Sequence, residues 1–410
     1  MVRPAPRVLR LSRRAAIKLV GSGVLGMLFR LPQATTPVRG AETPMELGLL
    51  HGRFYAYTGD PAAGTGYTVL DDDAAPLWLW YRRFGGPPVL GYPISQRFKQ
   101  DGVVQQLFQR GLLIWRPDAG IAELAPLLDW LSVRGRDAWL LTEKGIPLPL
   151  DPRAEAGLEP AEVHARRMAL LERYPELLFT LAQADDAETL YGLPTSPVVD
   201  MGSFYAVRLQ RTALQLWKVD TPWARAGEVT MVNAGEIARE AGMFDPAWLE
   251  PAPPPPEAFP LEVPVRVLIP AIRVDASVVV LGVTADGEME TPQNFMQVAW
   301  YNFGARPGEP SNCILSGHLD MPGGRPAVFY RLRELRPGHE VTLIGPSGTR
   351  YRYRVTESLS VPSADAPVAE IVGPTLEPVL TLITCDGTWN RAAGEYTERR
   401  VVRAALVAVE

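Results

Sequence analysis

A tract of prolines constrains the fold of this chain more than any other sequence feature. Residues 251–256 read PAPPPP, and such a tract favours the extended polyproline II conformation, which acts as a semi-rigid spacer. The tract predicts a linker over residues 251–260, between an accessory domain at 45–250 and a second domain at 261–410. The length of 410 residues suits two to three domains of about 100–200 residues each.

Charge is distributed unevenly along the chain. Residues 1–41 hold eight of the 41 basic residues and none of the 46 acidic ones, so the rest of the chain carries a formal charge of −13. A body this acidic is unsuited to polyanions, and no nucleic acid is expected as a main partner. Two cysteines and four histidines are too few soft ligands for a zinc ribbon or an iron–sulfur cluster. No acidic cluster demands a calcium ion, and no cofactor is expected.

The first 41 residues have the layout of an export signal. A basic stretch precedes the apolar run LVGSGVLGMLF at 19–29, and this order is typical of secretory signals. Within the basic stretch, SRRAAIK at 12–18 resembles the twin-arginine motif. The resemblance implies an exported protein on the extracellular face of the membrane or in the cell wall, whether the signal is cleaved or stays as an anchor. The alternative is a basic tail without a targeting role.

Residues 45–250 combine short apolar runs with an internal repeat. GYPIS at 91–95 is echoed 101 residues later by GLPTS at 192–196, and each copy continues with a Gln-Arg pair and a tryptophan. These markers are Gln109-Arg110 and Trp115 in the first copy, and Gln210-Arg211 and Trp217 in the second. Each copy is predicted to form a turn, a short strand, a second turn and a second strand. Between the copies, residues 160–173 are predicted to form an amphipathic helix.

The repeat resembles the LGFP-like repeat of wall-associated bacterial proteins. The resemblance lies in the G-[YL]-P-x-S core and in the downstream Q-x-x-x-QR-x-x-[LI]-W pattern. It implies that this mixed, β-rich domain contacts the cell wall or a partner. The alternative is a β-rich spacer whose aromatic residues form its core.

The C-terminal region, 261–410, is dominated by strand-like sequence. Its runs are rich in Val, Ile, Leu and Thr and are separated by Gly, Pro and Asp turns, which favours an all-β barrel. The predicted strands are 263–269, 277–283, 313–315, 340–344, 351–356, 379–384 and 401–409.

The reactive residue types in this region stand at the ends of predicted strands. Cys385 ends an apolar run and precedes turn residues, where a cysteine is partly exposed and can act as a nucleophile. His318 stands at the edge of another run, and Arg399 and Arg400 open the last strand. Cysteine catalysis needs a thiolate, a proton carrier and a donor to the developing oxyanion. Cys385, His318 and an arginine supply those roles.

Side-chain alternation selects between the two arginines. Along the last strand, Arg399 shares one face with Val401, whereas Arg400 shares the other with Val402 and Ala404. The second face is more apolar and is expected to point to the core. Arg399 is therefore the predicted catalytic arginine, with Arg400 as the fallback.

These residues resemble the sortase family. TLITC at 381–385 matches the sortase signature T-L-x-T-C, GHLD at 317–320 looks like its histidine segment, and the order His, Cys, Arg is the same. Residues 268–274 and 329–338 are similar to the first strand and to the connection after the histidine. The resemblance covers about 150 of 410 residues and is closest to the compact class E and F barrels. Ala-Ala-Gly at 392–394 departs from the frequent Thr-Gly turn.

The resemblance implies an eight-stranded β-barrel and a cysteine transpeptidase that cuts a sorting signal on exported proteins. Cys385 would form a thioester, His318 would protonate the leaving amine, and Arg399 would stabilise the oxyanion. The acceptor would be an amine of a peptidoglycan cross-bridge or a protein lysine. Thr384 is expected to position the substrate or simply to pack in its strand. Asp320 is expected to orient the histidine loop or to cap a turn.

Three alternatives remain open at this point. Cys313 and Cys385 would form a structural disulfide if they pair as exported cysteines often do, although Cys313 lies in an apolar run where a buried thiol fits. The protein would be a non-catalytic wall-binding protein if the repeats carry the function and the barrel is degenerate. It would be a cysteine hydrolase if water alone releases the thioester.

Overall fold

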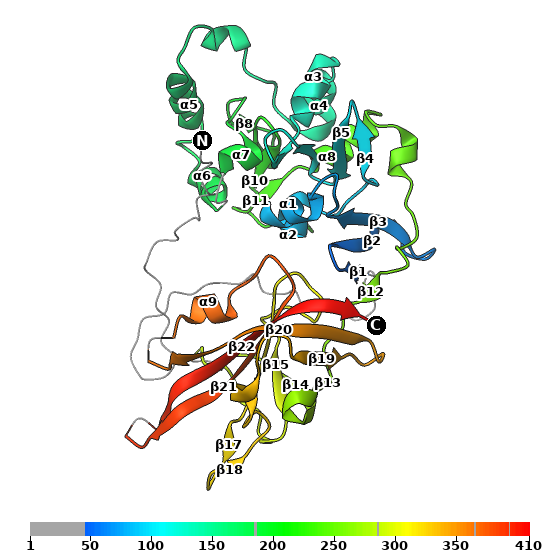
Figure 1. Cartoon of the computed structure of the whole chain (residues 1–410). Coiled ribbons are helices and arrows are strands. Elements are labelled where there is room, and N and C mark those ends of the chain that lie inside the picture. The colour runs from blue at the N-terminus through cyan, green and yellow to red at the C-terminus, as the bar shows by residue number, and fades with distance from the viewer. Residues whose placement is uncertain (1–45, 184–186, 285–286, 365, 393) are drawn as a thin grey trace, which may run out of the picture. The chain divides into compact units, whose positions relative to one another are not determined.

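The computed structural model describes residues 46–183, 187–284, 287–364, 366–392 and 394–410. Within these residues the chain divides into two compact units, with the boundary between Ala258 and Phe259 (Figure 1). The predicted export signal at 1–41 lies outside the described residues. No helix in the described ranges has the length and hydropathy that a membrane span requires.

The N-terminal unit is β-rich, as predicted, and carries several short helices. Its strands are β1 (Glu46–Leu49), β2 (Gly52–Asp60), β3 (Thr65–Leu70), β4 (Phe98–Gln100), β5 (Val103–Phe108), β6 (Gly111–Arg116), β7 (Ile121–Leu124), β8 (Val199–Asp200), β9 (Phe204–Arg208), β10 (Ala213–Trp217) and β11 (Val229–Met231). Its helices are α1 (Leu77–Arg83), α2 (Gly86–Leu90), α3 (Leu127–Val133), α4 (Asp137–Lys144), η1 (Pro152–Glu155), α5 (Pro160–Ala169), α6 (Pro175–Ala182), α7 (Ala187–Tyr191), α8 (Ala234–Glu240) and η2 (Pro246–Leu249).

The internal repeat has a structural counterpart in two four-stranded antiparallel sheets, β4-β5-β6-β7 and β8-β9-β10-β11. The repeated glutamine makes the same hydrogen bond in both copies, since the amides of Tyr92 and Leu193 each donate over 2.9 Å to Oε1 of Gln109 and Gln210. The turn before each tyrosine or leucine needs a glycine. At Gly192, for example, φ is +75° and a Cβ atom would lie 2.5 Å from Gln210.

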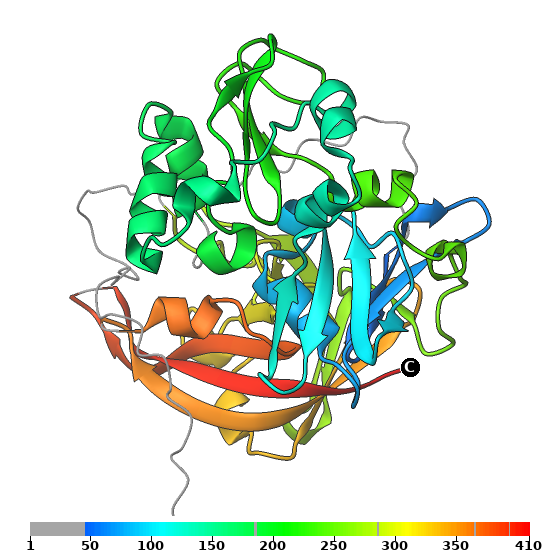
Figure 2. The same ribbon diagram turned by 90° about the horizontal axis from the view of Figure 1, so that it is seen from above.

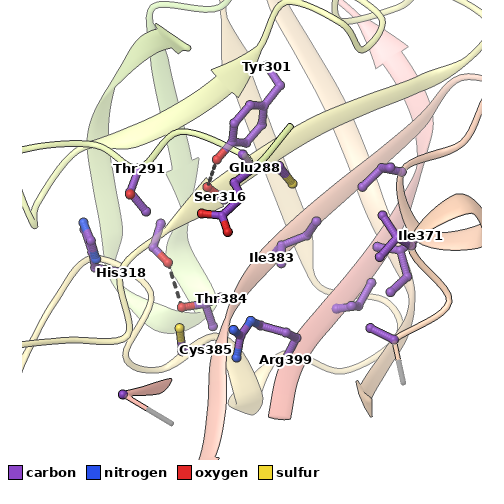
Figure 3. A pocket seen from close by; sticks show the side chains of 17 residues that line it. Glu288, Thr291, Tyr301, Ser316, His318, Ile371, Ile383, Thr384, Cys385 and Arg399 are labelled. Carbon is purple, nitrogen blue, oxygen red and sulfur yellow. Dashed lines mark hydrogen bonds between the residues drawn. The ribbon is translucent and has the colours of Figure 1, made fainter. Parts of the chain in front are cut away.

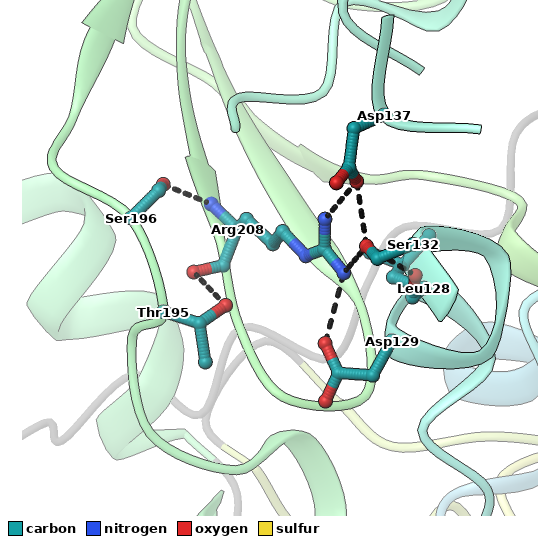
Figure 4. Close-up of polar contacts among 7 residues, drawn as sticks. All are labelled: Leu128, Asp129, Ser132, Asp137, Thr195, Ser196 and Arg208. Atoms are coloured by element: carbon teal, nitrogen blue, oxygen red, sulfur yellow. Dashed lines mark hydrogen bonds and ion pairs between the residues drawn. The ribbon is translucent and has the colours of Figure 1, made fainter. Parts of the chain in front are cut away.

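Arg208 is a charged residue at a position where the first copy has an apolar one (Figure 4). Its side chain is fully buried, and it donates to Asp129 Oδ1 at 2.8 Å, to Ser132 Oγ at 2.8 Å and to Asp137 Oδ1 at 3.3 Å. The equivalent residue of the first copy is Leu107, also fully buried. The guanidinium ties strand β9 to α3 and to the start of α4.

Two expectations for this unit differ from the structure. The helix predicted over 160–173 ends as α5 at Ala169, because the next residues form turns that lead into α6. The proline tract is not a free spacer along its whole length. The backbone of Ala252 exchanges two hydrogen bonds with Gly66, of 2.8 and 2.9 Å, so the start of the tract pairs with β3 of its own unit.

The C-terminal unit is an eight-stranded closed barrel with the strand order β13-β14-β15-β16-β21-β22-β20-β19, which confirms the predicted fold class. Its elements are β12 (Phe259–Pro260), β13 (Arg266–Ile269), η3 (Pro270–Ile272), β14 (Val274–Leu281), β15 (Val298–Tyr301), β16 (Asn312–Gly317), β17 (Asp320–Met321), β18 (Arg325–Pro326), η4 (Leu332–Glu334), β19 (Glu340–Ile344), β20 (Arg350–Pro362), α9 (Val368–Val372), β21 (Val379–Asn390) and β22 (Glu395–Val409).

The barrel interior is filled by the inward side chains of its strands. These alternate along each strand with outward ones, as the pleat requires, and the fully buried set includes Val267, Ile269, Val298, Leu315, Val341, Leu343, Leu380, Leu382 and Val402. Strands β20, β21 and β22 are much longer than the others and curve together along one side of the barrel (Figures 1 and 2).

Candidate active site

Strand pairing brings the three predicted catalytic residues to one place. Strands β16 and β21 are parallel neighbours, with Ser316 opposite Ile383, so His318 and Cys385, each two residues further on, lie at the same end of the barrel. Cys385 lies within β21 and not at a strand end as predicted, because β21 continues to Asn390. His318 comes directly after β16. Strand β22 runs antiparallel to β21 and places Arg399 opposite Cys385.

All three residues line a single cavity of about 410 Å³ (Figure 3). The cavity has a reactive side, formed by these residues and Thr384. Its apolar side is formed largely by α9, with Ile383 of β21 and Val401 of β22. The lining residues are Glu288, Met289, Thr291, Tyr301, Ser316, Gly317, His318, Ala366, Val368, Ile371, Val372, Ile383, Thr384, Cys385, Gly394, Arg399 and Val401.

The two cysteines lie in different environments, and both are free thiols. The disulfide alternative is therefore wrong for this structure. Cys313 is buried in the barrel core, where desolvation raises its pKa far above the ordinary value. Cys385 is half-buried. Burial raises its pKa, the Arg399 guanidinium lowers it, and the carboxylates of Asp320 and Glu395 raise it.

One backbone oxygen and one aromatic side chain set the position of His318. Its Nε2 atom lies 2.8 Å from the carbonyl oxygen of Pro292, and its ring packs against Phe295 with 4.6 Å between the ring centroids. Because a carbonyl oxygen only accepts hydrogen bonds, Nε2 must carry a hydrogen. The neutral ring is therefore basic at Nδ1, which is the atom left to exchange a proton.

Arg399 and Arg400 point to different surroundings. Arg399 lines the cavity, and its Nη1 donates to the carbonyl oxygen of Tyr396 at 2.9 Å, while Nη2 donates to Glu395 at 3.2 Å. Arg400 instead donates to Asp386 through Nε, at 2.8 Å, and through Nη2. The alternation argument from the sequence thus selected the arginine that reaches the cavity.

Thr384 and Asp320 both support neighbouring backbone or side chains. The buried hydroxyl of Thr384 donates over 2.7 Å to the carbonyl oxygen of Gly317, directly before His318. Asp320 accepts a hydrogen bond from the hydroxyl of Tyr396. That bond, together with burial, raises the pKa of Tyr396 to about 12. Both residues therefore connect the histidine segment to the strands that carry Cys385 and Arg399.

The remaining part of the cavity wall was not predicted from the sequence. Glu288 and Thr291 lie in the irregular segment between β14 and β15, which carries no recognisable motif. Ser316 directly follows the predicted strand 313–315, but its polar contact with Tyr301 joins residues 15 positions apart. Helix α9 has only five residues, too short for a periodic signal.

The described residues contain no group of three or more His, Cys, Asp or Glu side chains that could hold a metal ion. Within this part of the chain, the polar groups at the cavity are a thiol, an imidazole, a guanidinium, hydroxyls and a carboxylate. These groups suit acyl transfer through a covalent sulfur intermediate.

Comparison with known proteins gave one family and several structural neighbours. Residues 267–407 match the Sortase domain family model. Sortase A of Listeria monocytogenes is similar at 21% identity and a TM-score of 0.29, covering 37% of this chain and 90% of that one. A lid mutant of Corynebacterium diphtheriae sortase A has 18% identity and a TM-score of 0.28, covering 36% and 72%. A Clostridium perfringens sortase D5 transpeptidase has 21% identity and a TM-score of 0.27, covering 35% of this chain and 78% of that one.

No curated protein matched the chain. The family match lies entirely inside the C-terminal unit and spans all eight barrel strands and the candidate site. This unit is therefore similar to the Sortase domain across residues 267–407.

Proposed function

We propose that the C-terminal unit is a sortase-type cysteine transpeptidase and that Cys385, His318 and Arg399 carry its chemistry. The convergence of these three side chains on one cavity carries the proposal. The match of residues 267–407 to the Sortase domain supports the same reaction class.

In the proposed reaction, the Cys385 thiol first transfers its proton to Nδ1 of His318. The thiolate then attacks the carbonyl carbon of the scissile peptide bond, and a carbon–sulfur bond forms as the carbonyl electrons move to oxygen. Arg399 donates to this oxyanion. The His318 imidazolium protonates the leaving amine as the carbon–nitrogen bond breaks, which leaves a thioester on Cys385.

The second half of the reaction releases the thioester. A neutral acceptor amine attacks the thioester carbon, His318 takes the proton from the new amide nitrogen, and the Cys385 thiolate leaves. Since burial raises the pKa of Cys385, the thiol form predominates at neutral pH in the free enzyme. The proton transfer to His318 is therefore part of the activation of the nucleophile.

The proposed substrates are exported proteins that carry a sorting motif, and the proposed acceptors are amines of a peptidoglycan cross-bridge or of a protein lysine. The apolar side of the cavity, with Val368, Ile371 and Val401, suits an aliphatic side chain of the motif. The LGFP-like repeats of the N-terminal unit would keep the enzyme in contact with the cell wall, and the protein would work outside the cytoplasm.

A peptide library with mass-spectrometric product analysis tests this proposal. We expect the wild-type protein to cleave a subset of peptides and, with triglycine present, to convert part of the product into the triglycine adduct. Cys385→Ala should abolish both products, while Cys313→Ala, a matched change in the core, should retain them. Cleavage that never yields an adduct would identify a hydrolase. Cleavage by Cys385→Ala at the wild-type rate would refute the proposal.

A further inference from the structure

One wall of the cavity carries polar groups that have no role in the proposed transpeptidase chemistry. Glu288 and Ser316 both line the cavity, and Figure 3 shows both beyond Thr384 as seen from Cys385, with the Ser316 hydroxyl hydrogen-bonded to the hydroxyl of Tyr301. Glu288 is exposed to solvent, and its carboxylate points into the cavity. We refer to Glu288 and Ser316 as the acceptor wall.

The hydrogen-bond directions at this wall follow from a count of protons. The Tyr301 hydroxyl donates its single proton to the carbonyl oxygen of Glu290 over 2.7 Å. The contact of 2.6 Å between the Tyr301 and Ser316 oxygens must then use the proton of Ser316. Ser316 is left with lone pairs only, so towards the cavity it can accept hydrogen bonds but cannot donate them.

Among the other polar groups at the cavity, Thr384 shares this bias and Thr291 does not oppose it. The Thr384 hydroxyl also donates its single proton within the protein, to the carbonyl oxygen of Gly317. Thr291 has an exposed hydroxyl that can both donate and accept. The cationic group of the cavity, Arg399, is held beside Glu395 on the reactive side. The acceptor wall thus offers the carboxylate of Glu288 and the lone pairs of the Ser316 hydroxyl, which complement a cationic donor.

We propose that the acceptor wall binds an alkylammonium or guanidinium group of the molecules that react at Cys385. This inference rests on the proposed function and assigns a charge preference to the same site. The cation would be a lysine or arginine side chain in the sorting signal, or a second amino group on the acceptor. In either case Glu288 would determine specificity without touching the reacting atoms.

Charge-selective labelling of Cys385 tests the wall without any turnover. The probes are 2-aminoethyl methanethiosulfonate, which is cationic, and ethyl methanethiosulfonate, its neutral counterpart. With either reagent, the Cys385 thiolate attacks the sulfur atom that carries the ethyl or aminoethyl group. A disulfide forms and methanesulfinate leaves. We expect Glu288→Gln to lower the ratio of the cationic to the neutral rate about two- to fivefold, as for a solvent-exposed charge pair. Glu288→Lys should lower the ratio further.

The control variant is Glu377→Gln, which removes an exposed carboxylate that does not line the cavity. It should leave the rate ratio unchanged. An unchanged ratio in both Glu288 variants would overturn the inference. So would an equal change for the neutral reagent, which would indicate a change in thiol reactivity and not in charge selection.

Peptide assays then identify the source of the cation. If the sorting signal supplies it, Glu288→Gln should lower kcat/KM for hydrolysis of lysine-containing peptides relative to norleucine analogues. If the acceptor supplies it, only the ratio of transfer to hydrolysis should fall, and only with diamines such as lysinamide. A changed labelling ratio with no peptide cleaved by the wild type would refute the proposed function alone. Cleavage without any cation preference would refute this inference alone.

Discussion

The buried Arg208 cluster predicts an asymmetry between removing the cation and removing its anions. The Arg208 side chain is 0% exposed, whereas Asp129 and Asp137 are 46% and 33% exposed. The two carboxylates can therefore be solvated by water when the arginine is gone. The guanidinium has no such access to water when the carboxylates are gone.

The expected magnitudes follow from this difference in exposure. Asp129→Asn combined with Asp137→Asn leaves a buried cation without a counter-charge, which costs about 3–5 kcal/mol of folding free energy. For a unit of this size, each kcal/mol lowers Tm by about 2–4 °C, so the fall is about 6–20 °C. Arg208→Met keeps the volume and buries no charge, and it should cost about 1–2 kcal/mol.

Differential scanning calorimetry of the full chain measures these shifts, with the N-terminal transition assigned by its response to Arg208→Met. The triple variant, with all three charges removed, should recover most of the stability that the double Asp variant loses. A double Asp variant that loses no more stability than Arg208→Met would contradict the predicted asymmetry. A triple variant that is the least stable of the three would contradict it as well.

Two further predictions concern the candidate site. Arg399→Gln removes the charge that lowers the pKa of Cys385, so the pH midpoint of Cys385 alkylation should move upward and labelling at pH 8 should slow. Arg400→Gln should leave this midpoint unchanged. Equal shifts of the midpoint in both variants would contradict the assignment of Arg399. Thr384→Val removes the 2.7 Å hydrogen bond to Gly317, which should cost about 1–3 kcal/mol in thermal denaturation and lower kcat on cleaved peptides. Thr384→Ser should retain the kcat, and a loss equal to that of the valine variant would exclude the hydrogen bond as the cause.

The barrel strands could be predicted from the sequence because their side chains repeat with the period of the pleat. The run at 340–344 coincides with β19, and His318 directly follows β16 as predicted. Cys385 was predicted at the end of a strand, but it lies within β21, which continues through the predicted turn residues to Asn390. Strand β15 was missed. Its four residues, VAWY, are all buried and show no alternation between polar and apolar positions.

Contacts between residues that are far apart in the sequence could not be predicted from it. Arg208 meets Asp129 across 79 residues, and nothing in either local pattern marks the pair. The hydrogen-bond directions at the acceptor wall likewise depend on the bond from the Tyr301 hydroxyl to the Glu290 carbonyl oxygen, because that bond leaves Ser316 as the donor in its contact with Tyr301. The arginine at the site was predictable, because alternation along one strand decides between Arg399 and Arg400.

The proposed chemistry requires Cys385 to be a free thiol that opens to the cavity. The most direct test is to alkylate the native, non-reduced protein and to map the modified cysteines by mass spectrometry. We predict rapid modification of Cys385 and modification of Cys313 only after denaturation, since Cys313 is 1% exposed. A Cys385 that reacts only after denaturation, or that is found bonded to Cys313, would contradict the proposed chemistry.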